Sequence, residues 1–172
     1  WDLQKPGALW TSLFADYPAD PRQEALFDLI AEPRALPEEL NGDPAFFLGG
    51  SNRSDDLFMA LYRPLQGLAP NTPYAITLSV TLASNIPTGL FGIGGSPGDS
   101  VYVKGGVSAT EPNREVIDAW WRPTVDKGNQ ASNGAQGVTL GTIAKPEDGN
   151  DQWVLIERSN HRKPLTTTTS AD

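Results

Sequence analysis

The sequence predicts an all-β fold, built as a two-sheet antiparallel β-sandwich. Its 172 residues suit one domain with a single core. The 17 glycines and 15 prolines divide the chain in the way expected of many short strands joined by turns. The clearest strand has apolar residues at every second position, separated by small or polar ones: Tyr74, Ile76, Leu78, Val80 and Leu82. This alternation predicts a strand with one strongly apolar face.

Other strands are predicted from short apolar runs bounded by turn residues. Residues 57–62 form a nearly continuous apolar run, typical of a strand covered on both faces. Residues 67–73 are rich in glycine, proline and asparagine and predict the turn before the clearest strand. Further strands are expected at 90–93, 100–104, 138–143, 153–158 and 165–169.

Residues 1–44 are expected to form a less regular N-terminal segment packed on the sandwich. Asp20 and Pro21 could cap a helix, with Leu26, Leu29 and Ile30 at helical spacing and Pro33 as its stop. The alternative is a strand at 26–31 that ends near Pro33. The segment is too short for periodicity to decide, and we prefer the strand.

The charge of the chain excludes some classes of partner. A net charge of -8, from 13 basic and 21 acidic residues, disfavours nucleic acid and anionic membrane surfaces. No stretch approaches the roughly 20 apolar residues of a membrane-spanning helix. The lack of cysteine excludes disulfides and thiolate chemistry but does not identify the compartment. Because the sequence begins at Trp1, we expect either a mature protein whose signal peptide was removed or a recombinant fragment.

Four stretches carry a resemblance to a known group of proteins. They are FADYP at 14–18, SNRSDDLFM at 51–59, GIGGSPGDSVYVK at 92–104 and VDKGNQ at 125–130. Together they resemble a family of bacterial exported proteins without an assigned activity. The resemblance implies a secreted, periplasmic or cell-surface location and a galactose-binding-like or jelly-roll sandwich. Members of that family extend further, so we expect a final strand to follow Asp172 or to come from a neighbour in an assembly.

A ligand site is predicted around two adjacent tryptophans, Trp120 and Trp121. An indole could stack on a sugar ring, and Asp118 or Arg122 could hydrogen-bond to its hydroxyls. Neighbouring residues of a strand point to opposite faces, so one indole is expected at the surface and the other in the core. The simpler alternative is that both indoles seal the end of the sandwich.

Oxygen-bearing side chains in predicted loops suggest a structural calcium ion. Calcium takes about 6 to 8 oxygen ligands. The candidate ligands, which would have to converge from separate loops, are Asn52, Asp55, Asp56, Asp99, Asp126 and Asn129. The alternative is that these side chains cap turns.

No catalytic constellation is recognisable, so we predict that the protein is not an enzyme. His161 is the one histidine and lies in a polar stretch that predicts an exposed turn. No Gly-x-Ser-x-Gly elbow is present, and the glycine-rich stretch at 92–98 lacks the spacing of a phosphate-binding loop. The favoured function is non-catalytic glycan recognition. The alternative is a structural or assembly protein of the cell envelope or of an extracellular filament, joined through a sheet edge.

Overall fold

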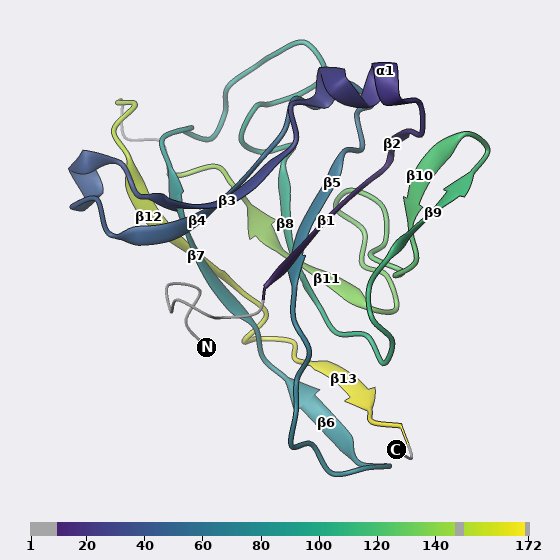
Figure 1. Ribbon diagram of the computed structural model, residues 1–172. Helices are drawn as coiled ribbons and strands as arrows, with labels where there is room; N and C mark the ends of the chain where they lie inside the picture. Colours follow the sequence, from purple (N-terminus) through teal and green to yellow (C-terminus); the bar gives the residue numbers. More distant parts are fainter. Residues whose placement is uncertain (1–9, 147–149, 171–172) are drawn as a thin grey trace. The chain divides into compact units, whose positions relative to one another are not determined.

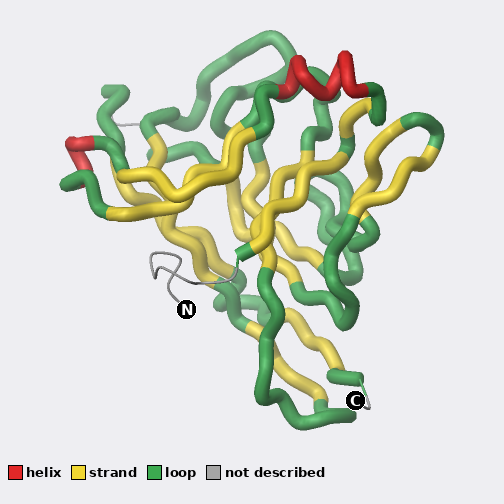
Figure 2. The backbone as a smooth tube through the Cα atoms, viewed as in Figure 1, coloured by secondary structure: helices red, strands yellow, loops and turns green. Residues whose placement is uncertain are grey.

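The structure is a computed structural model that describes residues 10–146 and 150–170. Trp1 and Asp172 lie outside the described residues. Within them, regular structure is almost entirely strand, with helical turns at α1 (Pro21–Glu24), η1 (Ala25–Phe27) and η2 (Glu38–Leu40) (Figures 1 and 2). The strands pair antiparallel in several small sheets, which confirms the all-β prediction and fits a β-sandwich. None of the described helices is long and apolar enough to cross a membrane.

The chain groups into two compact units. Unit 1 comprises residues 1–65 and 110–125, and unit 2 comprises residues 66–109 and 126–172. The single-domain organisation expected from the length stays a prediction.

The described residues of unit 1 form three small antiparallel sheets. β1 (Thr11–Ala15) pairs with β5 (Phe58–Tyr62), which confirms the strand predicted at 57–62. β3 (Ile30–Ala35) pairs with β4 (Pro44–Gly49). β10 (Trp120–Pro123) lies between β2 (Tyr17–Pro18) and β9 (Arg114–Ile117). Asp16, at φ 60°, links β1 to β2, and its amide donates to the Trp121 carbonyl at 2.7 Å.

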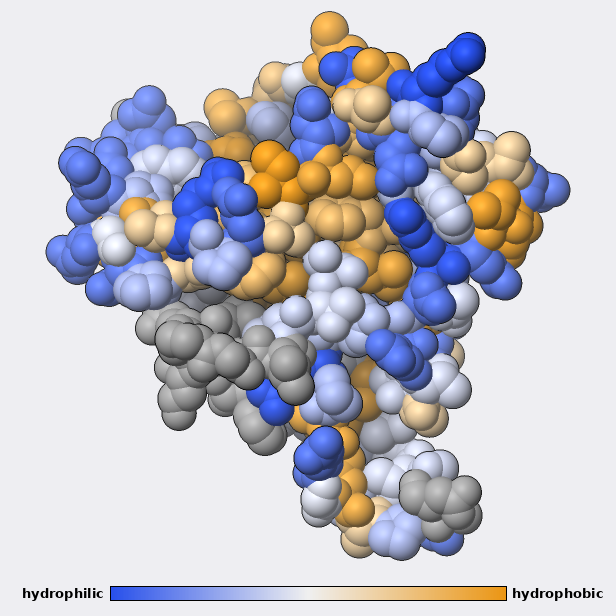
Figure 3. Space-filling view, in the orientation of Figure 1, coloured by the Kyte–Doolittle hydropathy of each residue, from blue (hydrophilic) through white to orange (hydrophobic). Residues whose placement is uncertain are grey.

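The core of unit 1 gathers around Tyr17, which is fully buried. On β1, Leu13 and Ala15 are buried while Ser12 is exposed, as the period of two in a strand requires. The ring of Phe27 packs against that of Tyr17, with centroids 5.2 Å apart. Figure 3 shows apolar side chains gathered over β1 and β5 in the middle of the view.

The helical interpretation is correct for residues 21–27 only, and the preferred strand at 26–31 is wrong except at its last two residues, which begin β3. The Asp20 carboxylate accepts a hydrogen bond from the Arg22 amide at 2.9 Å, and Pro21 occupies the first turn of α1. β3 begins only at Ile30 and continues through Pro33, which was expected to end it. Proline is tolerated there because β3 has β4 as its one partner strand, and an edge strand does not use every N–H group.

The N-terminal segment is also more regular than expected. Its described residues, 10–44, contain β1, β2, α1 and β3. The strands were missed because they have 2 to 6 residues each, too few for a periodic pattern.

A tight hairpin joins β9 to β10 (Figure 1). Trp120 pairs with Ile117, so the loop consists of Asp118 and Ala119 alone. Both have positive φ, 50° and 64°, as a type I′ turn requires. Aspartate is common at such a position, but alanine is disfavoured because its Cβ crowds the backbone in this conformation.

We therefore expect Ala119→Gly to raise the free energy of unfolding by about 1 kcal/mol. Urea denaturation followed by tryptophan fluorescence would measure the change. Ala25→Gly is the matched control, because Ala25 has a right-handed conformation with φ of -58°. Glycine at this position should lower the free energy of unfolding. Destabilisation by both substitutions would contradict the assignment of strain to Ala119.

Unit 2 also contains three antiparallel pairs, all close to predicted strands. β7 (Ser79–Ser84) pairs with β12 (Val154–Ser159), and β8 (Tyr102–Gly106) pairs with β11 (Gly137–Thr142). β6 (Pro73–Ile76) pairs with β13 (Leu165–Thr168). The strand expected at 90–93 is wrong, since these residues form part of the loop between β7 and β8.

The alternating burial predicted for the strand at 74–82 is confirmed, but the stretch forms two separate strands, β6 and β7. Burial alternates along the whole stretch, with the apolar positions more buried than their neighbours. The ladder breaks at Thr77 and Leu78, which separates β6 from β7. At the break the Asn160 side chain accepts from the Leu78 amide at 2.6 Å and donates to the Ile76 carbonyl at 3.1 Å. A buried side chain thus supplies hydrogen bonds that a partner strand would otherwise make.

Candidate functional site

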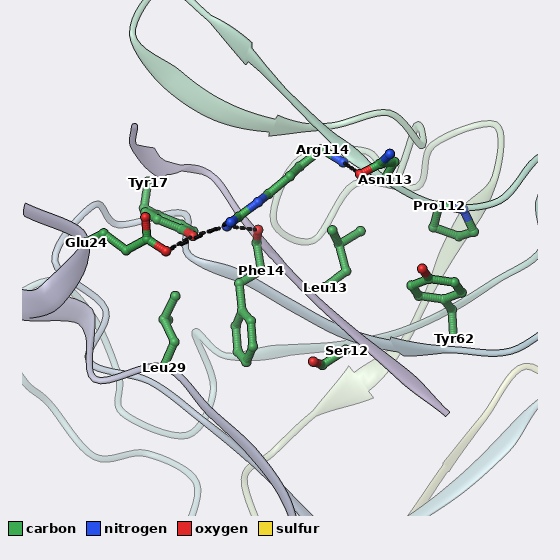
Figure 4. A pocket seen from close by; sticks show the side chains of 10 residues that line it. All are labelled: Ser12, Leu13, Phe14, Tyr17, Glu24, Leu29, Tyr62, Pro112, Asn113 and Arg114. Carbon is green, nitrogen blue, oxygen red and sulfur yellow. Dashed lines mark hydrogen bonds and ion pairs between the residues drawn. The ribbon is translucent and has the colours of Figure 1, made fainter. Parts of the chain in front are cut away.

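A pocket of about 400 Å³ lies in unit 1, beside β1 (Figure 4). Its walls come from β1, the end of β5, α1 and the start of β9. Aromatic rings and polar groups share the lining, and the residues that matter to its chemistry are Phe14, Tyr17, Glu24, Tyr62, Asn113 and Arg114.

Arg114 is held in the pocket by several groups. Its Nη1 donates to the Phe14 carbonyl at 3.2 Å and to the Tyr17 hydroxyl. The guanidinium carbon lies 4.2 Å from the ring centroid of Trp121, at a cation–π distance. Its Nη2 lies 3.9 Å from the Glu24 carboxylate. A long, flexible side chain is therefore held in one orientation in the pocket lining.

Tyr17 and Glu24 complete a polar cluster with Arg114. The Tyr17 hydroxyl donates to Glu24 Oε1 at 3.1 Å. Burial raises the pKa of Tyr17, Arg114 opposes the rise, and the hydrogen bond to Glu24 adds to it. Tyr17 therefore stays protonated at neutral pH and keeps donating to Glu24.

Asn113 and Tyr62 add further polar groups to the lining. The Asn113 side-chain oxygen accepts from the Arg114 amide at 2.8 Å, so the start of β9 is fixed locally. The Tyr62 hydroxyl donates to Glu111 at 3.0 Å. Both side chains are therefore oriented by contacts within unit 1.

The predicted ligand residues all lie on the β9–β10 hairpin, but on different sides of it. The guanidinium of Arg122 lies 5.0 Å from the Trp120 ring centroid and also binds Asp16 at 2.9 Å. Trp121 points the opposite way, toward Arg114. Both indoles are half-buried, so the expected split between one surface and one core tryptophan is not observed. Asp118 occupies the exposed turn.

Among the predicted ligand residues in the described part of the chain, Trp121 is thus the one whose ring lies against a residue of the pocket lining, Arg114. The central residues of the pocket were missed because Arg114 and Tyr17 are 97 residues apart and belong to no common spacing. The available signal was the FADYP stretch at 14–18, which contains Phe14 and Tyr17.

Two of the predicted calcium ligands stabilise loops of unit 2. The Asp99 carboxylate accepts from the Gly89 amide at 2.8 Å, from Thr88 Oγ1 at 2.8 Å and from Ser96 Oγ at 3.1 Å. The Asp126 carboxylate accepts from the amides of Ala135 and Gly128 at 2.8 and 3.0 Å.

The remaining predicted ligands lie in turns of both units. Asn52 Oδ1 accepts from the Ser54 and Leu57 amides at 3.2 and 3.4 Å, and Asp55 has φ of 66°. Asp56 lies near them in unit 1, and the Asn129 carbonyl accepts from the Ser132 amide at 2.7 Å in unit 2. In the described part of the chain, no three His, Asp or Glu side chains are grouped to hold a metal ion. Calcium stays a prediction, to be tested by thermal unfolding with EDTA and with calcium restored.

The hydrogen bonds to Asp99 and Asp126 predict a loss of stability in acid. Backbone donation from Gly89 lowers the pKa of Asp99, and donation from Ala135 and Gly128 lowers that of Asp126. A lowered folded-state pKa gives stability that is present above the unfolded pKa of about 4 and is lost as pH falls through the folded value. We expect stability to fall below about pH 4, and less steeply in Asp99→Asn and Asp126→Asn.

Denaturation at a series of pH values would measure this dependence. Asp118→Asn is the control, because Asp118 lies in an exposed turn. Unchanged pH dependence in both test variants would contradict the assigned role of these carboxylates.

His161 lies exposed in the turn between β12 and β13, as its polar surroundings predict. It belongs to unit 2, whereas the pocket belongs to unit 1.

Comparison with models of protein families, with curated proteins and with solved structures finds no match to this chain.

Proposed function

We propose that the pocket of unit 1 binds a neutral glycan without catalysis. The observation that carries the proposal is the fixed guanidinium of Arg114, which lies among aromatic rings and hydrogen-bond acceptors in a pocket of about 400 Å³. That volume is within the range of about 300 to 1,000 Å³ for small-molecule sites.

Sugar hydroxyls both donate and accept hydrogen bonds, and the pocket offers partners for both. The Arg114 guanidinium can donate, while the Glu24 carboxylate and the side-chain oxygen of Asn113 can accept. Phe14 and Tyr62 provide apolar surface for the C–H faces of a sugar ring. Because these side chains are already oriented, little conformational entropy is lost on binding.

The charges favour a neutral sugar over an acidic one. The positive charge of Arg114 is offset by Glu24 at 3.9 Å. The protein as a whole carries a net charge of -8, which repels polyanionic chains.

Glu24 is the one carboxylate among the residues that line the pocket. A typical glycosidase needs two carboxyl groups across the sugar. The lining therefore supports binding rather than hydrolysis. The resemblance to bacterial exported proteins suggests that this recognition takes place in the periplasm or outside the cell, on a jelly-roll scaffold.

A glycan array with the whole protein, run with and without calcium, would test the proposal. Arg114→Met removes the guanidinium and keeps the aliphatic stem, so we expect binding to fall at least about tenfold. Arg122→Met is the matched control, since Arg122 also lies over a tryptophan but does not line the pocket. Equal loss in both variants, or no glycan bound by the parent protein, would reject the proposal.

The alternative proposal is assembly through a sheet edge. It is favoured by β9, the outer strand of the β2–β10–β9 sheet, where Val116 and Ile117 are 54% and 46% exposed. Sedimentation of the parent protein and of Val116→Lys would test it. A concentration-dependent oligomer that the substitution dissociates would support assembly, and a monomer at all concentrations would reject it.

A further inference from the structure

The loop between β7 and β8 of unit 2 carries two fully exposed apolar side chains in its middle. Phe91 is 100% exposed and Ile93 is 110% exposed, and the adjoining Leu90 is 41% exposed. Single exposed apolar residues are common, but two large ones projecting from one loop mark an interaction site. We call Leu90, Phe91 and Ile93 the apolar tip.

The part of the loop that carries the apolar tip is uncharged, since residues 85–98 contain no charged side chain. Asp99, which follows in the same loop, accepts hydrogen bonds from Thr88 Oγ1, the Gly89 amide and Ser96 Oγ, which ties the two ends of the loop together. These hydrogen bonds hold the base of the loop in place below the apolar tip. Insertion of the apolar tip into an apolar phase would bury no charged side chain of residues 85–98.

An apolar groove of about 640 Å³ continues from the apolar tip. Leu90 belongs to both, and Ile86, Pro87 and Pro97 form the apolar part of the groove. Asn150 and Asp151 also line it. The groove thus combines apolar side chains with polar and acidic ones.

We propose that the apolar tip docks unit 2 on a zwitterionic lipid bilayer, inserting Phe91 and Ile93 into the interfacial region. The apolar tip carries no positive charge, the protein is acidic and Asp151 lies in the adjoining groove, so attraction to anionic headgroups is not the driving force. Binding depends instead on burial of apolar side chains.

A second copy of the chain fits the apolar tip less well. Two side chains of this size supply roughly 400 Å², whereas each partner in a stable interface buries about 800 Å².

Vesicle flotation with phosphatidylcholine vesicles would test the proposal on the whole protein. A single myristoyl chain binds membranes with an association constant of about 10⁴ M⁻¹, and two side chains bind more weakly. We expect half of the protein to float at about 1 mM accessible lipid, with no increase when phosphatidylglycerol is added. The double variant Phe91→Ser/Ile93→Ser should bind at least about tenfold more weakly.

The control is Leu65→Ser/Leu68→Ser, which changes two other loop leucines that are 44% and 42% exposed. It should float like the parent protein. Because the four substituted side chains are exposed, folding should be retained, and circular dichroism would verify it. A parent protein that does not float at several millimolar lipid, or equal flotation of the tip variant, overturns the proposal. A dimer in sedimentation that only the tip variant dissociates would also overturn it, in favour of a second copy.

Discussion

Replacing Tyr17 by alanine should lower the free energy of unfolding of unit 1 by about 4 kcal/mol. Tyr17 is fully buried, packs against Phe27 and hydrogen-bonds to Glu24. Alanine would leave a cavity in the core and would remove the acceptor of Arg114. Urea denaturation followed by tryptophan fluorescence would measure the loss, because Trp10, Trp120 and Trp121 all belong to unit 1.

Tyr17→Phe separates the two contributions, since it keeps the ring and removes the hydroxyl. Its expected cost is about 1 to 2 kcal/mol. Leu26→Ala is a control for surface truncation, because Leu26 is 53% exposed and should cost far less. A Tyr17→Ala variant as stable as Leu26→Ala would show that Tyr17 is not in the core of the folded protein.

Asn160→Ala should lower the stability of unit 2 by about 3 kcal/mol. The Asn160 side chain is buried and serves both the Leu78 amide and the Ile76 carbonyl at the break between β6 and β7. Alanine would leave both backbone groups without this partner in a half-buried position. Hydrogen exchange of the Leu78 amide provides a local measurement and should become much faster in the variant.

His161→Ala is the matched control, because His161 is the next residue and is exposed. It should leave the exchange of Leu78 and the overall stability nearly unchanged. Unchanged exchange of Leu78 in Asn160→Ala would contradict the bridging role.

The sequence predicted the strands of unit 2 better than those of unit 1, for a physical reason. The stretch at 74–82 shows clear alternation because one of its faces is covered, and this pattern survives the break at Thr77 and Leu78. In unit 1, β2 has 2 residues and β9 has 4, so neither can show a period. The apolar run at 90–93 was mistaken for a strand because exposure cannot be read from hydrophobicity alone.

The candidate site was less predictable than the fold. The tryptophans drew attention because of their residue type, yet each faces an arginine rather than an open pocket. The pocket depends on Arg114 reaching Tyr17 across 97 residues of sequence, a contact that follows from tertiary folding and not from a motif. Similarly, Asp99 and Asp126 suggested calcium by their residue type, whereas their oxygen atoms accept hydrogen bonds within their own loops.

The most direct test of glycan binding by the pocket is an NMR titration that observes the arginine Nε–H groups. The protein would be titrated with the best neutral glycan from the array. We predict that the Nε–H signal of Arg114 shifts with saturable dependence on glycan concentration, while that of Arg122 stays in place. Saturable shifts elsewhere in the protein with an unchanged Arg114 signal would contradict the account, because the glycan would then bind outside this pocket.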